Sequence, residues 1–115
     1  MNNTRCVSFP FVVALLILCL PGTNVFAASF DCAKATTFQE QTICKSPELS
    51  HLDQEMAALY KAVLSTSPRP EQIKDEQRQW LAIRSQLCAD AACIKTSLEY
   101  RIRELQAIYE TNPAP

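Results

Sequence analysis

Glycine is almost absent from this chain of 115 residues, which contains Gly22 and no other. Glycine adopts positive φ without a steric penalty, so two-residue β-hairpin turns and phosphate-binding loops depend on it. The absence of glycine after position 22 therefore argues strongly against a hairpin-rich β fold and against a glycine-dependent phosphate loop.

Charge is also scarce at the N-terminus, where Arg5 is the only charged residue before Asp31. Residues 7–20 form an almost uninterrupted apolar run, which is shorter than the roughly 20 apolar residues of a bilayer-crossing helix. Ala27 is small and Val25, two positions before it, is acceptable, which fits signal-peptidase cleavage after Ala27. We therefore predict that residues 1–27 are a signal peptide and that the mature protein is periplasmic or secreted, without membrane contact after cleavage. A retained membrane anchor is the alternative.

The mature chain is short and mildly acidic. Removal of residues 1–27 leaves 88 of the 115 residues, and the loss of Arg5 leaves 10 Lys and Arg against 12 Asp and Glu. The resulting net charge of about −2 argues against nucleic acid as a partner, because nucleic-acid-binding surfaces are usually basic. A domain of this length has a small core, so we expect its stability to depend on additional covalent cross-links.

Four of the six cysteines remain in the mature chain: Cys32, Cys44, Cys88 and Cys93. An even number of cysteines in an exported domain is typical of disulfides. A zinc site is the alternative, but the spacings are not those of common zinc motifs and His51 is the only histidine. Three pairings are possible, and we predict the local one, Cys32 with Cys44 and Cys88 with Cys93.

The predicted bridge between Cys88 and Cys93 requires a break between two helices. In an unbroken helix, residues five apart have Cα atoms about 7.5 Å apart, beyond the usual disulfide limit of roughly 7 Å. The chain between these cysteines must therefore leave the helical path. Asp90 is the expected N-cap of the helix that follows.

Hydrophobic periodicity and capping signals predict four helices. Thr37 followed by Glu40 indicates a capping box, and the short helix that it begins is expected to carry Cys44 past an extended segment that holds Cys32. Ser46 followed by Pro47 and Glu48 indicates the N-cap and first turn of the next helix. The predicted helices span residues 37–44, 47–65, 70–88 and 91–110.

These elements predict an all-α fold class. Because the connections between the long helices are short, they are expected to pack antiparallel. The expected architecture is a small antiparallel bundle of three long helices plus a short N-terminal helix, with two local disulfides. The domain would span residues 28–110, and residues 111–115 would form a flexible tail.

Motif residues are spread over nearly all of the mature chain. Their most specific part is Gln77-x-x-Trp80-Leu81-x-x-Arg84 together with the four cysteines. The other positions are Asp31, Glu40, Asp53 and Tyr60, and a basic residue on the last helix that is either Arg101 or Arg103. This set resembles the LprI-like lysozyme-inhibitor family over about residues 29–109. The resemblance implies a small, exported, all-helical bacterial domain with two local disulfides, in a family named for inhibition of lysozyme.

The motif around Trp80 allows two interpretations. Its residues fall at helical spacing and share one side of a helix, and an aromatic beside an arginine is typical of a protein-binding surface. In the other interpretation, Trp80 fills the core while Arg84 pairs with Glu40 or Asp53 and lays its stem over the indole. We predict the second, because so small a domain needs its one tryptophan in the core.

Candidate catalytic groups are few. Glu40 and Asp53 are the acids to consider as general acid and base, but they lie on different predicted helices, where acids commonly serve the helix dipole or a salt bridge. His51 is expected to be exposed, and nothing completes a nucleophilic triad with it. One charged group on the last helix is expected to form a solvated face: Glu99, Arg101, Arg103 and Glu104. We predict a protein that is not an enzyme and that needs no cofactor or metal.

The function that the resemblance implies is binding and inhibition of lysozyme. A lysozyme cleft presents two carboxyl groups at the scissile bond, so a stiff turn that carries a cation or a donor suits an inhibitor. The candidate inhibitory contacts lie in two predicted turns: Lys45 and Ser46 in one, Ser67 and Arg69 in the other. The alternative function is a periplasmic structural or interaction module that binds another cell-envelope protein.

Overall fold

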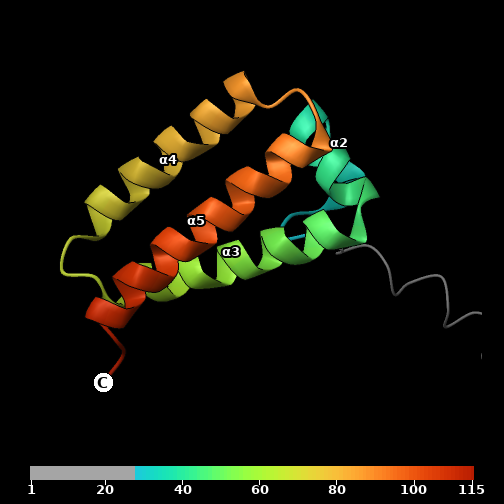
Figure 1. Cartoon of the computed structure of the whole chain (residues 1–115). Helices are drawn as coiled ribbons and strands as arrows, with labels where there is room; N and C mark the ends of the chain where they lie inside the picture. The colour runs from blue at the N-terminus through green and yellow to red at the C-terminus, as the bar shows by residue number, and fades with distance from the viewer. Residues whose placement is uncertain (1–27) are drawn as a thin grey trace, which may run out of the picture.

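The computed structural model describes residues 28–115, and all of the regular structure in this part of the chain is helical (Figure 1). The elements are the 3-10 helix η1 (Cys32–Lys34) and the α-helices α2 (Phe38–Lys45), α3 (Pro47–Thr66), α4 (Pro70–Leu87) and α5 (Ala91–Thr111). This arrangement confirms the predicted all-α fold class. The predicted signal peptide lies outside the described residues. Between positions 28 and 115, no helix has the length and apolar character needed to cross a membrane.

The three long helices form an antiparallel bundle. In Figure 1, α3 leads away from α2, α4 returns toward it, and α5 leads away again to the C-terminus. The most extensive packing is between α3 and α5, while α4 packs less closely against both. The fully buried side chains of the core come from α2, α3 and α5: Ile43, Val63, Ile94, Leu98 and Leu105.

Side-chain caps begin the helices where the sequence predicts them. The Oγ1 atom of Thr37 accepts a hydrogen bond from the Glu40 backbone N–H at 3.2 Å, and the Glu40 carboxylate accepts from the Thr37 hydroxyl at 3.0 Å. The Ser46 hydroxyl caps α3 by accepting from the Leu49 N–H at 3.2 Å. No residue among positions 28–115 has positive φ, so these connections form without glycine.

Both predicted disulfides are present. Cys88 and Cys93 are bridged with their Cα atoms 5.2 Å apart, closer than an unbroken helix would place them. The expected helix break lies between α4 and α5, where the Asp90 carboxylate accepts from the Cys93 N–H at 2.8 Å. Cys32 and Cys44 are bridged with their Cα atoms 5.8 Å apart.

The segment that holds Cys32 is not extended, and that expectation was wrong. Cys32 begins the 3-10 turn η1. The Asp31 carboxylate accepts from the Ala33 N–H at 3.0 Å, and the Asp31 carbonyl accepts from the Lys34 N–H at 3.0 Å. An aspartate that caps the residues after it favours such a turn over an extended strand.

Candidate functional site

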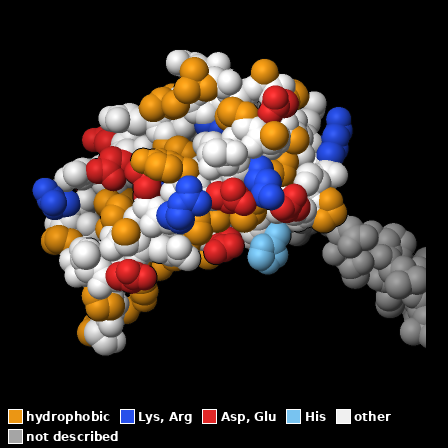
Figure 2. Space-filling model, viewed as in Figure 1, with side chains coloured by type: hydrophobic (Ala, Val, Ile, Leu, Met, Phe, Trp, Pro, Cys, Tyr) orange, Lys and Arg blue, Asp and Glu red, His pale blue; other side chains and the backbone are white. Residues whose placement is uncertain are grey.

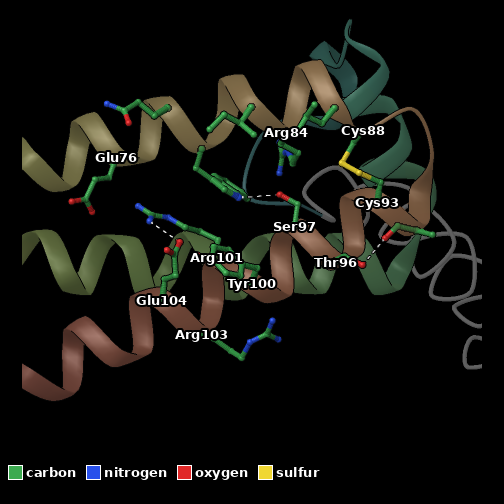
Figure 3. Close-up of a pocket in the computed structure, with 15 residues that line it drawn as sticks. Glu76, Arg84, Cys88, Cys93, Thr96, Ser97, Tyr100, Arg101, Arg103 and Glu104 are labelled. Carbon is green, nitrogen blue, oxygen red and sulfur yellow. Dashed lines mark hydrogen bonds and ion pairs between the residues drawn. A yellow bond between two sulfur atoms is a disulfide. The ribbon is translucent and has the colours of Figure 1, made fainter.

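An open groove of about 790 Å³ runs between α4 and α5. We call it the α4–α5 groove and show its lining side chains in Figure 3. The disulfide between Cys88 and Cys93 lies at one end, and Glu76 and Glu104 lie at the other. The disulfide thus joins the two helices at one end of the groove.

Exposed apolar side chains border this groove. Ile83, Leu87 and Tyr100 line it and are 54%, 73% and 53% exposed. Figure 2 shows hydrophobic side chains exposed along the edge of the molecule where α4 runs, whereas charges of both signs are mixed over α5. A cluster of exposed large apolar side chains in a hollow is typical of a binding surface.

The exposure of this rim follows from the narrow buried face of α4. The buried residues of α4 are Ile73, Gln77, Trp80 and Arg84, which recur at steps of four, three and four and form a single stripe. Two of the four are polar, so α4 turns little apolar surface toward the core. Its remaining large apolar side chains, Leu81, Ile83 and Leu87, lie at the borders of that stripe and are exposed.

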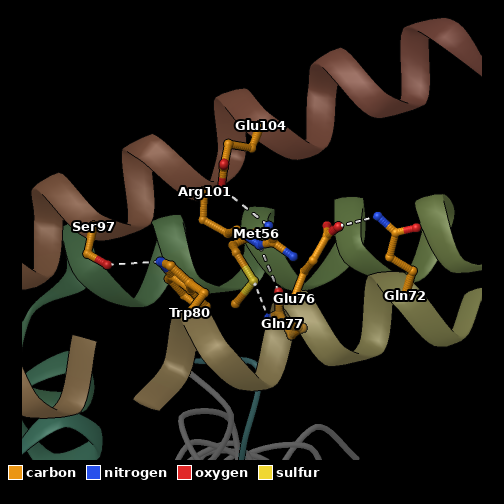
Figure 4. Close-up of polar contacts among 8 residues, drawn as sticks. All are labelled: Met56, Gln72, Glu76, Gln77, Trp80, Ser97, Arg101 and Glu104. Atoms are coloured by element: carbon orange, nitrogen blue, oxygen red, sulfur yellow. Dashed lines mark hydrogen bonds and ion pairs between the residues drawn. The ribbon is translucent and has the colours of Figure 1, made fainter. Parts of the chain in front are cut away.

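Trp80 lies in the core at the floor of the groove, with 9% of its surface exposed. Its indole Nε1 donates a hydrogen bond to the Ser97 hydroxyl on α5 at 3.0 Å (Figure 4). The guanidinium carbon of Arg84 lies 4.7 Å from the centre of the indole ring, a separation typical of a cation–π contact. Trp80 therefore joins α4 to α5 and supports Arg84.

Arg84 does not form the expected ion pair with Glu40 or Asp53. Glu40 binds the hydroxyl that caps its own helix, and one carboxylate oxygen of Asp53 accepts from both the backbone N–H and the hydroxyl of Ser29. The charge of Asp53 still acts on Arg84 through space. Burial lowers the pKa of Arg84, and the nearby negative charge of Asp53 opposes that change.

Two nitrogen atoms of the Arg84 guanidinium lack hydrogen-bond acceptors in the described part of the chain. Its Nε and Nη1 atoms are buried and have no hydrogen-bond partner within residues 28–115, and the residue as a whole is 8% exposed. Buried donors are normally satisfied, because an unpaired one incurs a desolvation cost of about 1 to 3 kcal/mol, or more when the group is charged. A buried cation that lines a groove and lacks an acceptor is a candidate for ligand contact.

Arg101 is buried, which corrects the expectation that it belongs to a solvated face. It is 3% exposed, and its Nε donates to the Gln77 side-chain oxygen at 2.9 Å while its Nη1 lies 3.2 Å from the Glu104 carboxylate (Figure 4). Gln77 is held in turn by its Nε2, which donates to the Met56 sulfur at 3.2 Å. One Arg101 nitrogen, Nη2, is buried without a partner among the described residues.

The sequence contains a signal for this burial. Ile94, Leu98, Arg101 and Leu105 recur at steps of four, three and four, so Arg101 occupies a position in the apolar stripe of α5. The other basic residue, Arg103, is exposed. The structure therefore makes Arg101 the basic residue of α5 that faces the core.

The remaining motif residues lie apart from the groove. Tyr60 is half-buried on α3 and packs against the core. His51 is exposed on the same helix, beside a smaller hollow of about 350 Å³ that also includes Lys45. Glu40 and Asp53 make separate contacts with Thr37 and Ser29, so they do not form a pair of catalytic acids.

The four candidate inhibitory contacts lie at the two ends of α3. Lys45 is exposed at the end of α2 and precedes Ser46, the cap of α3. Arg69 is exposed before α4, and its backbone N–H donates to the Ser67 hydroxyl at 3.0 Å. The 20 residues of α3 between these turns correspond to about 30 Å of helix. The candidate inhibitory contacts therefore form two separate sites, one at each end of α3 (Figure 1).

Fold and disulfides define a small helical domain held by two local cross-links. A family model described as "Lysozyme inhibitor LprI" matches residues 32–107, more than half of the chain. The chain belongs to the LprI lysozyme-inhibitor family. No curated protein and no solved structure matches it.

Proposed function

We propose that the mature protein is an exported, non-enzymatic inhibitor that binds lysozyme. The observation that carries this proposal is membership of the LprI family over residues 32–107. The two disulfides support export, because disulfides form and persist in oxidising compartments outside the cytosol. The net charge of about −2 after cleavage gives mild attraction at most to a basic enzyme, so recognition must come from particular contacts.

The turn that carries Arg69 is one candidate for insertion into a lysozyme cleft. Arg69 lies between Pro68 and Pro70 and is exposed, and it makes no ion pair within residues 28–115. Two prolines and the Ser67 hydrogen bond restrict the backbone, so little conformational entropy would be lost on binding. An arginine presents paired N–H groups that suit the carboxyl groups of the cleft.

The turn that carries Lys45 is the second candidate. Lys45 is exposed directly after Cys44, whose disulfide to Cys32 anchors this end of α2. The Ser46 hydroxyl caps α3 and is therefore less available to a partner. Lys45 provides the charge of this turn. Lys45 likewise has no ion-pair partner in the described part of the chain. Because the two turns lie at opposite ends of α3, we treat each as a separate route to the cleft.

Two half-buried cations, by contrast, are already paired with acids. Lys74 lies 2.8 Å from the Glu71 carboxylate, and Lys95 lies 2.8 Å from the Glu48 carboxylate. Such cations are less available to a partner than those of the two turns. Lys61 is exposed on α3, has no ion pair with a described residue and lies outside both turns, so it provides a matched control.

The test is lysis of a bacterial cell-wall suspension by lysozyme, with and without the purified mature protein. We expect inhibition by the unmodified protein. Charge reversal by Lys45→Glu or Arg69→Glu is expected to weaken inhibition at least tenfold, about 1.4 kcal/mol, in whichever turn enters the cleft. The same charge change in Lys61→Glu should leave inhibition intact. Helical content and melting temperature should be unchanged in all three variants.

Two results would count against parts of this proposal. Full inhibition by the double variant Lys45→Glu, Arg69→Glu would remove both turns and direct attention to the helix faces. No inhibition by the unmodified protein would refute lysozyme binding. It would favour the alternative, a module that binds another cell-envelope protein.

A further inference from the structure

The α4–α5 groove combines an apolar rim with a buried, unpaired cation. Ile83, Leu87 and Tyr100 are exposed at its rim. Arg84 lines the same groove with two buried guanidinium nitrogens that have no acceptor within residues 28–115. Figure 3 shows Arg84 extending from α4 toward α5, into the space between the two helices. The complementary ligand has an apolar body and an anionic group.

The acids near the groove do not supply that anion. The Glu104 carboxylate is paired with Arg101 at 3.2 Å, and the Glu76 carboxylate accepts from the Gln72 amide at 2.9 Å. Both acids lie at the end of the groove opposite the disulfide (Figure 3). Arg101 and Arg103 line the groove as well, so the charges of these two acids are balanced by two cations, whereas Arg84 has no acid from residues 28–115 bound to it. The anion is therefore expected at Arg84, nearer to Cys88 and Cys93.

The dimensions of the groove suit a small molecule. The α4 side of the groove runs from Glu76 to Cys88, a length of about 18 Å. The groove volume of about 790 Å³ lies in the range of about 300 to 1,000 Å³ that is common for small-molecule sites.

We propose that the α4–α5 groove binds an alkyl carboxylate, a single unbranched hydrocarbon chain that ends in an ionised carboxylate. The carboxylate would accept hydrogen bonds from Arg84, whose planar guanidinium suits this group. The hydrocarbon chain would lie over Trp80, between Ile83 and Tyr100. This proposal concerns a site that lysozyme inhibition through the turns does not use, and it does not depend on that function.

Trp80 provides the readout, because it is the only tryptophan of the chain and lines the groove. Dodecanoate is added to the mature protein below its micelle-forming concentration while the tryptophan fluorescence is followed. We expect a saturable change with one ligand per protein. Dodecyltrimethylammonium has the same chain length but a cationic head, and acetate has the head without the chain. Each should bind at least tenfold more weakly than dodecanoate.

Variants on the rim test the location without disturbing the core. Leu87→Glu places a charge on an exposed position of the groove and should weaken dodecanoate binding at least tenfold. Leu81→Glu makes the same change at an exposed position of α4 outside the lining and should leave binding unchanged. Arg84→Gln should also weaken binding at least tenfold. Because Arg84 is buried, its replacement can reduce stability, and the pair at positions 87 and 81 tests the site independently of that effect.

Three results would overturn the proposal. The first is the lack of saturable binding of dodecanoate. The second is equal affinity for dodecanoate and dodecyltrimethylammonium, which would mean that Arg84 does not recognise the head. The third is a concentration-dependent dimer in sedimentation that Leu87→Glu abolishes, without dodecanoate binding, which would assign the groove to a second copy of the chain.

Discussion

Replacement of Trp80 by alanine tests the role of the tryptophan most directly. Trp80 is 9% exposed, donates to the Ser97 hydroxyl at 3.0 Å and supports the Arg84 guanidinium. Trp80→Ala would leave a cavity between α4 and α5 and remove all of these contacts. Because α4 contributes few apolar side chains to the core, it has little other surface with which to compensate.

The expected loss is a large part of the total stability. Truncation of a buried aromatic to alanine reduces the free energy of unfolding by about 3 to 5 kcal/mol. The 88 residues from Ala28 onward correspond to a total of about 4 to 13 kcal/mol at the usual value per residue. The variant is therefore expected to be largely unfolded or to melt at least about 12 °C lower.

The assay is urea and thermal unfolding followed by far-ultraviolet circular dichroism, since the variant has no tryptophan to observe. Trp80→Phe is the matched control. It keeps an aromatic ring beneath Arg84 but loses the hydrogen bond to Ser97, so its cost should be smaller, about 1 to 2 kcal/mol. If Trp80 is a core residue, Trp80→Ala should be much less stable than Trp80→Phe.

The opposite result would refute the reasoning. If Trp80→Ala melted within about 3 °C of the unmodified protein and lost partner binding instead, Trp80 would be a contact residue and not a core residue. Equal losses in the two variants would mean that the Ser97 hydrogen bond, not the packing of the ring, dominates.

Two further predictions concern the ends of the groove. The double variant Cys88→Ser, Cys93→Ser opens a loop of about six residues and should reduce the free energy of unfolding by about 2 kcal/mol. Chemical denaturation without reductant measures this loss. An unchanged denaturation midpoint would contradict the prediction. The Glu104 carboxylate raises the pKa of Tyr100 by hydrogen bonding and by its charge. Because a negative neighbour favours the neutral phenol, Glu104→Gln should lower that pKa toward its usual value in an NMR titration of the ring, and no change would show that the carboxylate is not the cause.

Local rules were sufficient to predict much of this protein. The caps at Thr37, Ser46 and Asp90 act on backbone groups within three residues, so they can be recognised without the tertiary structure. The disulfide between Cys88 and Cys93 can also be predicted locally, because a bridge between residues five apart requires a helix break between them. The all-α class and the helix ranges depend on such local patterns.

The roles of charged residues were decided by the tertiary structure. Arg101 occupies an apolar stripe position close to the charged residues Glu99, Arg103 and Glu104. The sequence does not show that the Nε of Arg101 donates to Gln77 on another helix. The expected partner of Arg84 was wrong for a related reason. The capping box accounts for Glu40, but the sequence does not show that Asp53 accepts hydrogen bonds from Ser29, which lies 24 residues earlier in the chain.

The α4–α5 groove was likewise invisible in the sequence. The sequence predicts the helix that holds Ile83 and Leu87, but it does not give the angle at which that helix packs against its neighbours. In the structure, α4 packs through one stripe that is half polar, which leaves these side chains exposed beside α5. The helices and their cross-links depend on residues that are near neighbours along the chain, so they can be predicted from the sequence, whereas the groove depends on how distant segments pack.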